Sequence, residues 1–294
     1  MASNFELFDK LPDQLKPDRV GQFDPGHVWT EHKAKLISRY LRYFVFITKH
    51  GAYIDGFAAP KQPDKSETWA AQLVLETEPK FLRQFFLCEL KPNRAKYLCE
   101  LKKSQPLLPK RHIEVIEGDF NLSIDQILSS GLIKDKTASF CLLDQFTCQC
   151  HWSTLKKLAE HKRQSERKIE LFYFLGTGWL DRALPAFTRN DHIPAAWWGR
   201  PDWRSLVGLG PNKLVLKFIE RFKSELGYQF VQPYPIYQRR GKNGRIMFYM
   251  IHASDHPQAP ILMKRAYKSA LEILETEDQL QLELKDFIAA ESNQ

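Results

Sequence analysis

The sequence lacks the long apolar runs of a membrane protein. None of its apolar stretches approaches the ~20 residues that a bilayer-spanning helix needs, and the opening MASNFELFDKLPDQLK has no apolar signal-peptide core. Cysteine is also scarce. The 5 cysteines are an odd number in a chain of 294 residues, which is typical of reduced thiols rather than of a disulfide framework. These absences predict a cytoplasmic protein without a membrane segment.

Three catalytic motifs are missing as well. The sequence contains no G-x-S-x-G, no H-E-x-x-H and no Walker A pattern, so it gives little support to hydrolase or P-loop chemistry. It also shows no internal repeat and no low-complexity tract. The fold must therefore be inferred from the hydrophobic period of the chain.

The composition is that of a protein with a packed core, with 43% hydrophobic and 27% charged residues. Lysine and arginine number 43 against 35 aspartates and glutamates, a formal net charge of +8. This excess fits an extended anion such as nucleic acid as a partner. Because the basic stretches are interleaved with acids, it fits ordinary solvated charge equally well.

Short apolar runs alternate with helical patterns along the first part of the chain. Each run ends in an acidic or polar residue: AYIDG, FFLCEL, IEVIEGD, SFCLLDQ and IELFYFLG. The acids Asp55, Glu89, Asp119 and Asp144 follow one another at intervals of 34, 30 and 25 residues, the length of a strand and its crossover. Continuous apolar runs indicate strands that are buried on both faces. The pattern predicts a parallel sheet with helices on both sides.

The flanking segments complete an α/β organisation. An amphipathic helix is predicted within 27–50, and 230–237 and 246–254 read as a closing antiparallel hairpin before a terminal helix. Within 181–210, prolines and tryptophans interrupt the hydrophobic period of the chain. We therefore expect an N-terminal extension, a Rossmann-like core, a Trp-rich insertion and a C-terminal part of the core, at 1–26, 27–180, 181–210 and 211–294.

The strand-end acids are the candidate ligand-binding residues, because ligands of open parallel sheets collect at the carboxyl ends of the strands. Asp55 could accept a hydrogen bond from a ligand amine while Gly56 lets the backbone come close, or it could cap the next helix. Glu89 could accept the two hydroxyls of a ribose, or it could simply begin a solvated loop.

Two further acids occupy equivalent positions. Asp119 could accept the exocyclic amine of an adenine while Phe120 offers an apolar face, although Gly118-Asp119 is also a common turn. Asp144 could orient or deprotonate a nucleophile, or it could stabilise a helix N-terminus. Three acids in register at three strand ends carry more weight than any one of them.

Other clusters have a chemical and a structural interpretation. Cys148, Cys150 and His151 could bind zinc, but paired C-x-x-C spacings are missing, so buried thiols and no metal are predicted. His252, Asp255 and His256 could form a catalytic dyad or a metal pair, but their place between the last strand and Pro257 predicts a turn and a helix cap. The Trp-rich segment could contact unpaired bases and phosphates or form the core of a small lobe. Its members are Trp179, Trp197, Trp198 and Trp203 with Arg182, Arg200 and Arg204.

Several segments together resemble one family. They are YIDGFAAP, FFLCELKPNRAKYL, IEGDFN, SFCLLDQF followed by HWSTLKKLA, and FYMIHASDHPQAPILMKRA. In order and spacing they look like the three-Cys-motif partner protein (TcmP) family, whose members are similar to class I S-adenosylmethionine-dependent methyltransferases. The resemblance runs from about His27 to Tyr267. It implies a seven-stranded methyltransferase fold that ends in an antiparallel hairpin, and association with a separate cysteine-motif protein.

The resemblance also assigns roles to residues. It implies that Asp55, Gly56 and Phe57 belong to the motif that binds the methionine part of S-adenosylmethionine, and that Glu89 binds its ribose. By the same resemblance, Asp119 and Phe120 would lie at the adenine and Asp144 at the catalytic fourth motif. Arg182, Trp198 and Arg200 are the candidate contacts to a nucleic-acid substrate.

Two positions depart from the family pattern. Ala59 stands where members tend to have glycine (DGFAGPG), and Gln145 stands where proline is expected (DPFG). Two functions therefore stay open. The first is a methyltransferase that acts on nucleic acid. The second is a methyltransferase-shaped scaffold subunit without turnover, working within a complex, for example in defence against phage.

Overall fold

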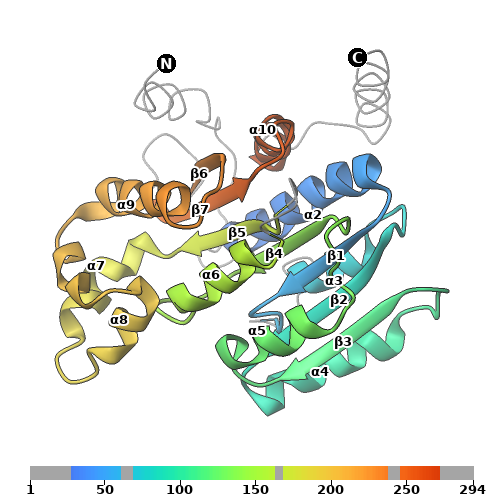
Figure 1. The fold of residues 1–294 in the computed structure, drawn as a ribbon, viewed down its shortest axis with the longest axis horizontal. Coiled ribbons are helices and arrows are strands. Elements are labelled where there is room, and N and C mark those ends of the chain that lie inside the picture. The colour runs from blue at the N-terminus through green and yellow to red at the C-terminus, as the bar shows by residue number, and fades with distance from the viewer. Residues whose placement is uncertain (1–27, 61–68, 163–167, 238–245, 272–294) are drawn as a thin grey trace.

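One seven-stranded sheet organises the chain, with helices on both of its faces (Figure 1). A computed structural model describes residues 28–60, 69–162, 168–237 and 246–271. The strand order is β3-β2-β1-β4-β5-β7-β6. The strands are β1 (Gly51–Asp55), β2 (Leu82–Glu89), β3 (His112–Glu117), β4 (Ser139–Leu143), β5 (Glu170–Leu175), β6 (Phe230–Tyr237) and β7 (Ile246–Ser254).

The direction of the strands confirms the predicted fold class. Strands β1 to β5 are parallel, whereas β7 is antiparallel to both β5 and β6. This order and the closing hairpin are those of a class I methyltransferase-like, Rossmann-like fold. All five residues of β1 are buried, as expected for a central strand covered on both faces. The turn of the hairpin, at 238–245, lies outside the described residues.

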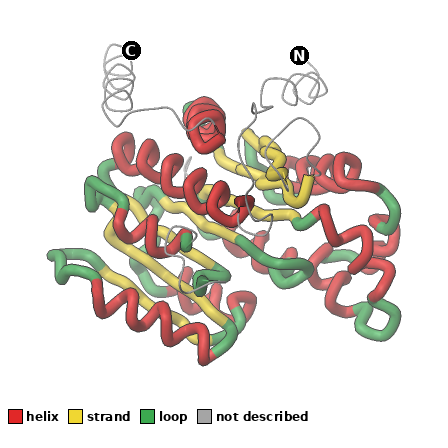
Figure 2. Tube along the Cα trace, turned by 180° about the vertical axis from the view of Figure 1, so that it is seen from behind, coloured by secondary structure: helices red, strands yellow, loops and turns green. Residues whose placement is uncertain are grey.

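The helices form two layers, which Figure 2 shows from behind. Among the described residues, no helix combines the length and apolar character needed to cross a membrane. The helices are α2 (Val28–Thr48), α3 (Ala70–Glu76), α4 (Pro92–Ser104), α5 (Phe120–Ser129), α6 (Trp152–Glu160), α7 (Thr177–Ala186), α8 (His192–Trp198), α9 (Gly210–Ser224) and α10 (Ala259–Leu271), with a short 3-10 helix at Pro201–Leu206.

Each face of the sheet has its own apolar core, because successive strand residues point to opposite faces. Ile54 of β1 belongs to the core shared with α5 to α9. Its neighbour Tyr53 belongs to the core shared with α2, α3, α4 and α10. The tryptophans of the segment 181–210 are part of the first core, so this segment packs on the sheet.

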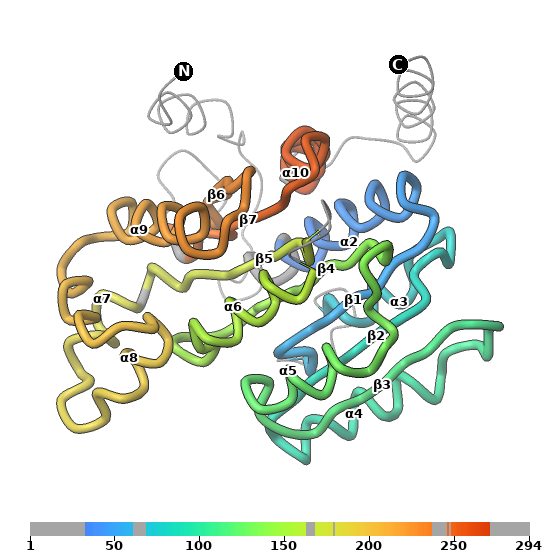
Figure 3. The backbone as a smooth tube through the Cα atoms, viewed as in Figure 1, coloured from blue at the N-terminus to red at the C-terminus, as the bar shows by residue number. Residues whose placement is uncertain are grey.

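The chain order creates a switch point beside β1. From β1 the chain moves through β2 to β3 at one edge, and it then returns to β4 on the other side of β1. In Figure 3, strands β1 to β3 lie toward the right of the view and helices α7 to α9 lie toward the left. Ligands of open α/β sheets bind outside the carboxyl ends of the strands at such a point.

The edge strands are β3 and β6, and β6 contains Pro233 and Pro235.

Candidate functional site

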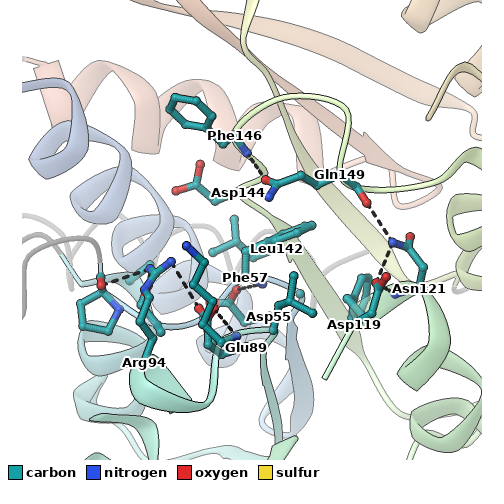
Figure 4. A pocket seen from close by; sticks show the side chains of 18 of the residues that line it. Asp55, Phe57, Glu89, Arg94, Asp119, Asn121, Leu142, Asp144, Phe146 and Gln149 are labelled. Atoms are coloured by element: carbon teal, nitrogen blue, oxygen red, sulfur yellow. Dashed lines mark hydrogen bonds and ion pairs between the residues drawn. The ribbon is translucent and has the colours of Figure 1, made fainter. Parts of the chain in front are cut away.

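A cavity of about 580 Å³ lies at the carboxyl ends of the strands around the switch point. Asp55, Glu89, Asp119 and Asp144 all line it, and they come from the ends of β1 and β2 and from the segments after β3 and β4 (Figure 4). Gly56, Phe57 and Phe120 line the same cavity. The structure therefore brings together every residue predicted to bind the cofactor and the predicted catalytic acid.

Asp55 is almost fully buried at the end of β1, with 2% of its surface exposed. Its Oδ2 accepts a hydrogen bond from the Tyr53 hydroxyl (2.8 Å), and its Oδ1 accepts one from the Phe57 amide (3.1 Å). Burial raises the pKa of the Asp55 carboxyl from 3.8 to about 7, and the negative charges of Asp144 and Glu89 add to this rise, while the two hydrogen bonds oppose it. The carboxyl therefore changes charge near neutral pH.

Gly56 permits a close approach between the first loop and α5. A Cβ atom at this position would lie 2.9 Å from the Phe120 ring, a distance that side chains do not tolerate. The Gly56 amide donates to the Leu142 carbonyl of β4 (3.0 Å). Phe57 packs at an angle on Phe120, with ring centroids 6.2 Å apart. The glycine is needed here for space.

Ala58 and Ala59 complete this loop without strain. Neither has a positive φ, since Lys49 and Lys110 are the non-glycine residues with positive φ in the described part of the chain. Both alanines are buried in the core beside α2 and α3. Their carbonyls accept hydrogen bonds from Trp69 Nε1 (2.7 Å) and an Arg94 guanidinium nitrogen (2.8 Å). The backbone therefore does not require the family glycine at position 59.

Glu89 ends β2 and is also buried, with 5% of its surface exposed. Its Oε1 accepts a hydrogen bond from the Lys91 amide (3.0 Å), and its Oε2 lies 3.7 Å from Arg94 Nη1. Arg94 also donates to the carbonyls of Ala59 and Pro60. One guanidinium thus links the acid of the second strand to the loop after the first.

Asp119 caps helix α5 and lines the cavity at the same time. Its Oδ1 accepts from both the backbone and the side-chain amide of Asn121 (2.8 Å each). The Asn121 side chain also donates to the Gln149 carbonyl and accepts from the His151 amide and the Thr154 hydroxyl. Asn121 therefore ties the third strand end to the loop after β4.

Asp144 forms an ion pair with Lys33 of α2. Lys33 lines the cavity although only 1% of its surface is exposed. Its ammonium lies over the rings of Phe174 and Phe248, 4.6 and 4.7 Å from their centroids. The predicted catalytic acid thus faces a buried cation from a helix that precedes the first strand.

Gln145 organises the loop that follows Asp144. The residue is buried (1% exposed), and its Oε1 accepts hydrogen bonds from the Gln149 amide (3.0 Å) and the Cys150 amide (2.8 Å). In return, the Gln149 side chain accepts from the Phe146 amide (2.8 Å). The hydrogen bonds that Gln145 accepts fix this loop at the position where the TcmP pattern has a proline.

Two cysteines lie in the loop after β4. Cys148 and Cys150 are buried, and no group of three potential metal ligands occurs in the described ranges. Burial raises the pKa of the Cys148 thiol to about 12 and raises that of Cys150 as well. Both thiols stay protonated at neutral pH, as a core thiol should.

The histidines near the C-terminus fit the predicted turn only in part. Asp255 and His256 lie between β7 and α10, and Asp255 accepts from the Gln229 amide (2.9 Å). The expectation for His252 was wrong, because it lies inside β7 and is 1% exposed. Its Nε2 is 3.1 Å from Glu170 Oε2, which also accepts from the Tyr40 hydroxyl (2.5 Å). This buried network joins α2 to the sheet.

Trp198, a predicted contact to nucleic-acid bases, is a buried residue. Only 3% of Trp198 is exposed, and its Nε1 donates to Asp202 (2.9 Å). Its ring packs against Phe218 and against the guanidinium of Arg221. A base can stack only on an accessible face, and Trp197, Trp198 and Trp203 lie in the core, in agreement with the alternative interpretation.

The two arginines predicted with Trp198 lie outside the cavity. Arg182 is exposed on α7, and Arg200 is exposed after α8, where it pairs with Glu225 (2.5 Å). Neither lines the cavity with the strand-end acids. Their positions give no direct support to a role at the site.

Sequence reasoning missed Lys33, Arg94 and Asn121. A signal for Lys33 was present, because it lies three and seven residues before Leu36 and Tyr40 and so continues their apolar stripe. A lysine in an apolar stripe indicates a buried charge with a partner. Arg94 and Asn121 act through hydrogen bonds between segments far apart in the chain, which spacing does not reveal.

No protein-family model matches the sequence, and no curated protein matches it either. The fold and the cavity are therefore the observations from which a function is inferred.

Proposed function

We propose that this protein binds S-adenosylmethionine in the strand-end cavity and methylates nucleic acid. The observation that carries the proposal is the convergence of Asp55, Glu89 and Asp119 from three neighbouring strands on one cavity. The size of about 580 Å³ lies within the range of small-molecule sites. Carboxylates suit a ligand that presents an ammonium group, ribose hydroxyls and an exocyclic amine as donors.

The residues of the cavity fit such a cofactor. Asp55 would hold the ammonium of the methionine part, Glu89 the ribose hydroxyls and Asp119 the adenine amine, with Phe57 and Phe120 as apolar walls. When bound, the cofactor supplies an electrophilic methyl group. Asp144 lies after β4, on the other side of β1 from β2 and β3, and would orient the acceptor or take its proton.

Removal of the Glu89 carboxylate should weaken cofactor binding. In titration calorimetry of the full chain, we expect Glu89→Ala to lower the affinity for S-adenosylmethionine by about 10- to 100-fold, the loss for hydrogen bonds to a charged group. Glu117→Ala is the matched control, because Glu117 ends the neighbouring strand and is exposed. The control should bind like the wild type. Absence of binding by the wild type at millimolar cofactor would contradict the proposal and favour the scaffold function.

The raised pKa of Asp55 predicts a pH-dependent affinity. Its carboxyl is mostly protonated below its pKa of about 7, and only the ionised form attracts an ammonium group. Between about pH 5.5 and pH 7, where an α-amino group keeps its proton, affinity should therefore rise roughly tenfold. Asp55→Asn should bind more weakly and lose this rise. A wild-type affinity that stays constant over this interval would refute the role of Asp55.

The resemblance to the TcmP family supports a second proposal, which concerns a partner protein and the biological setting. We infer from the resemblance to the TcmP family that the chain works with a three-cysteine-motif protein, in a setting such as defence against phage. The net charge of +8 supports a nucleic-acid substrate. The alanine loop supports turnover rather than loss of it, since Ala59 occupies this loop without a positive φ.

A further inference from the structure

The buried pair of Lys33 and Asp144 calls for a functional explanation. A lysine that is 1% exposed loses its hydration, and burial of a charged pair costs free energy even when the two charges face each other. An apolar side chain in the same place would pack on Phe174 and Phe248 without this penalty. A buried charge that also lines a ligand cavity is a candidate for chemistry.

The pair lies on the acceptor side of the proposed cofactor site. The sheet order is β3-β2-β1-β4, so the three cofactor-binding acids belong to one side of the switch point and Asp144 to the other. Phe146 follows two residues after Asp144, lines the cavity and is 52% exposed. Figure 4 shows Phe146 and Asp144 on the same loop. An exposed ring beside a carboxylate gives a planar group a surface on which to stack.

The charge of Lys33 selects the type of acceptor atom. An ammonium has three donors and no acceptor, so it stabilises an oxygen that gains negative charge. It opposes methylation of a neutral nitrogen, which gains positive charge as the new bond forms. Asp144 pairs with the ammonium and can receive a proton from a hydroxyl that approaches both groups from the cavity. The pair therefore suits a hydroxyl acceptor.

We propose that Lys33 and Asp144 hold a ribose 2′-hydroxyl as the methyl acceptor, so that the nucleic-acid substrate is RNA and not DNA. This inference rests on the proposed function. An internal nucleotide of DNA has no hydroxyl, whereas every internal ribose offers one. The hydroxyl oxygen forms the bond to the methyl carbon as the carbon–sulfur bond breaks, the electron pair stays on sulfur, and the hydroxyl proton passes to the Asp144 carboxylate. Lys33 stabilises the charge on the oxygen throughout.

The test uses two matched pools of short oligonucleotides of random sequence, one of RNA and one of DNA. The full chain is incubated with methyl-labelled S-adenosylmethionine and each pool, and the products are digested to nucleosides and identified by mass spectrometry. We expect label on the ribose of RNA nucleosides and none in DNA. Label on a base, label in DNA, or no label in RNA would overturn the inference. Calorimetry with the cofactor on the same preparation shows separately whether the proposed function fails.

A variant of Lys33 gives a second test with a readout other than turnover. Lys33→Met should lower the rate of RNA methylation by about 100-fold or more while the cofactor affinity changes by less than about threefold. In fluorescence anisotropy, the wild type should bind RNA more tightly than DNA, and Lys33→Met should lose this preference. Lys35→Met, an exposed position on the same helix, is the control and should keep both properties. An unchanged preference in Lys33→Met would count against the proposal.

Discussion

Replacement of Arg221 by methionine should lower the free energy of unfolding by about 3–5 kcal/mol, the range found when a buried ion pair loses one partner. Arg221 is 5% exposed and donates two hydrogen bonds to Glu225 (2.6 and 2.9 Å) and one to the Trp198 carbonyl. Its guanidinium lies between two indole rings, 3.7 Å from the centroid of Trp152 and 4.0 Å from that of Trp198. The substitution removes all of these contacts at once.

Urea unfolding, followed by tryptophan fluorescence, measures this loss, and Arg200→Met is its control. Arg200 pairs with the same Glu225, but its side chain is 49% exposed. Solvent-exposed ion pairs contribute about 0–1 kcal/mol, so the control should unfold almost like the wild type. Equal losses in the two variants would show that burial between the tryptophans adds nothing to the pair.

Gly199→Ala should destabilise the same region by at least about 3 kcal/mol, as the sum of backbone strain and overpacking. Gly199 ends α8 with φ of +73°, in the left-handed region that favours glycine. An added Cβ would lie 2.4 Å from Cβ and 2.6 Å from Cγ of Trp152. Because Trp152 is buried in the core, it has no free space into which it can move.

Gly208→Ala separates the two contributions. Gly208 has a similar φ of +76°, but a Cβ there would meet no atom within 4 Å. Its cost should be the conformational one alone, about 1–2 kcal/mol. Thermal or urea unfolding of both variants gives the cost of the Trp152 contact as their difference. Similar losses for Gly199→Ala and Gly208→Ala would contradict the steric argument.

The fold could be predicted because its pattern is local. The parallel strands β1, β4 and β5 are short apolar runs buried along their whole length, and each run ends at the same edge of the sheet. The regular spacing of these runs along the chain then indicated the crossover connections between successive strands. The hairpin was visible as two apolar segments around a polar turn, and it forms as β6 and β7.

The candidate site could be predicted as far as the backbone determines it. Parallel strands bring their carboxyl ends to one edge, so Asp55, Glu89 and Asp144 had to lie near each other once the strands were assigned. What the side chains do there was not visible. Arg94 and Asn121 make contacts that depend on loop geometry, and Lys33 pairs with an acid 111 residues away.

The burial of Trp198 could not be predicted from the sequence. Tryptophan and arginine in one segment are typical both of base-binding surfaces and of packed lobes. Composition therefore does not distinguish these two kinds of structure. In the structure, Phe218 and Arg221 of the separate helix α9 cover the Trp198 indole. Only the packing of α8 against α9 distinguishes the two interpretations.

The two prolines of β6 limit how this protein can associate. Pro233 and Pro235 pair with Ile251 and Tyr249 of β7, two positions apart, so both nitrogens face the same direction across the strand. Proline has no amide hydrogen, and on an edge strand its nitrogen belongs on the side away from the sheet. An incoming strand would find two donors missing there. Docking of a further protein, or of a second copy, on this flank should therefore proceed through helices rather than by sheet extension.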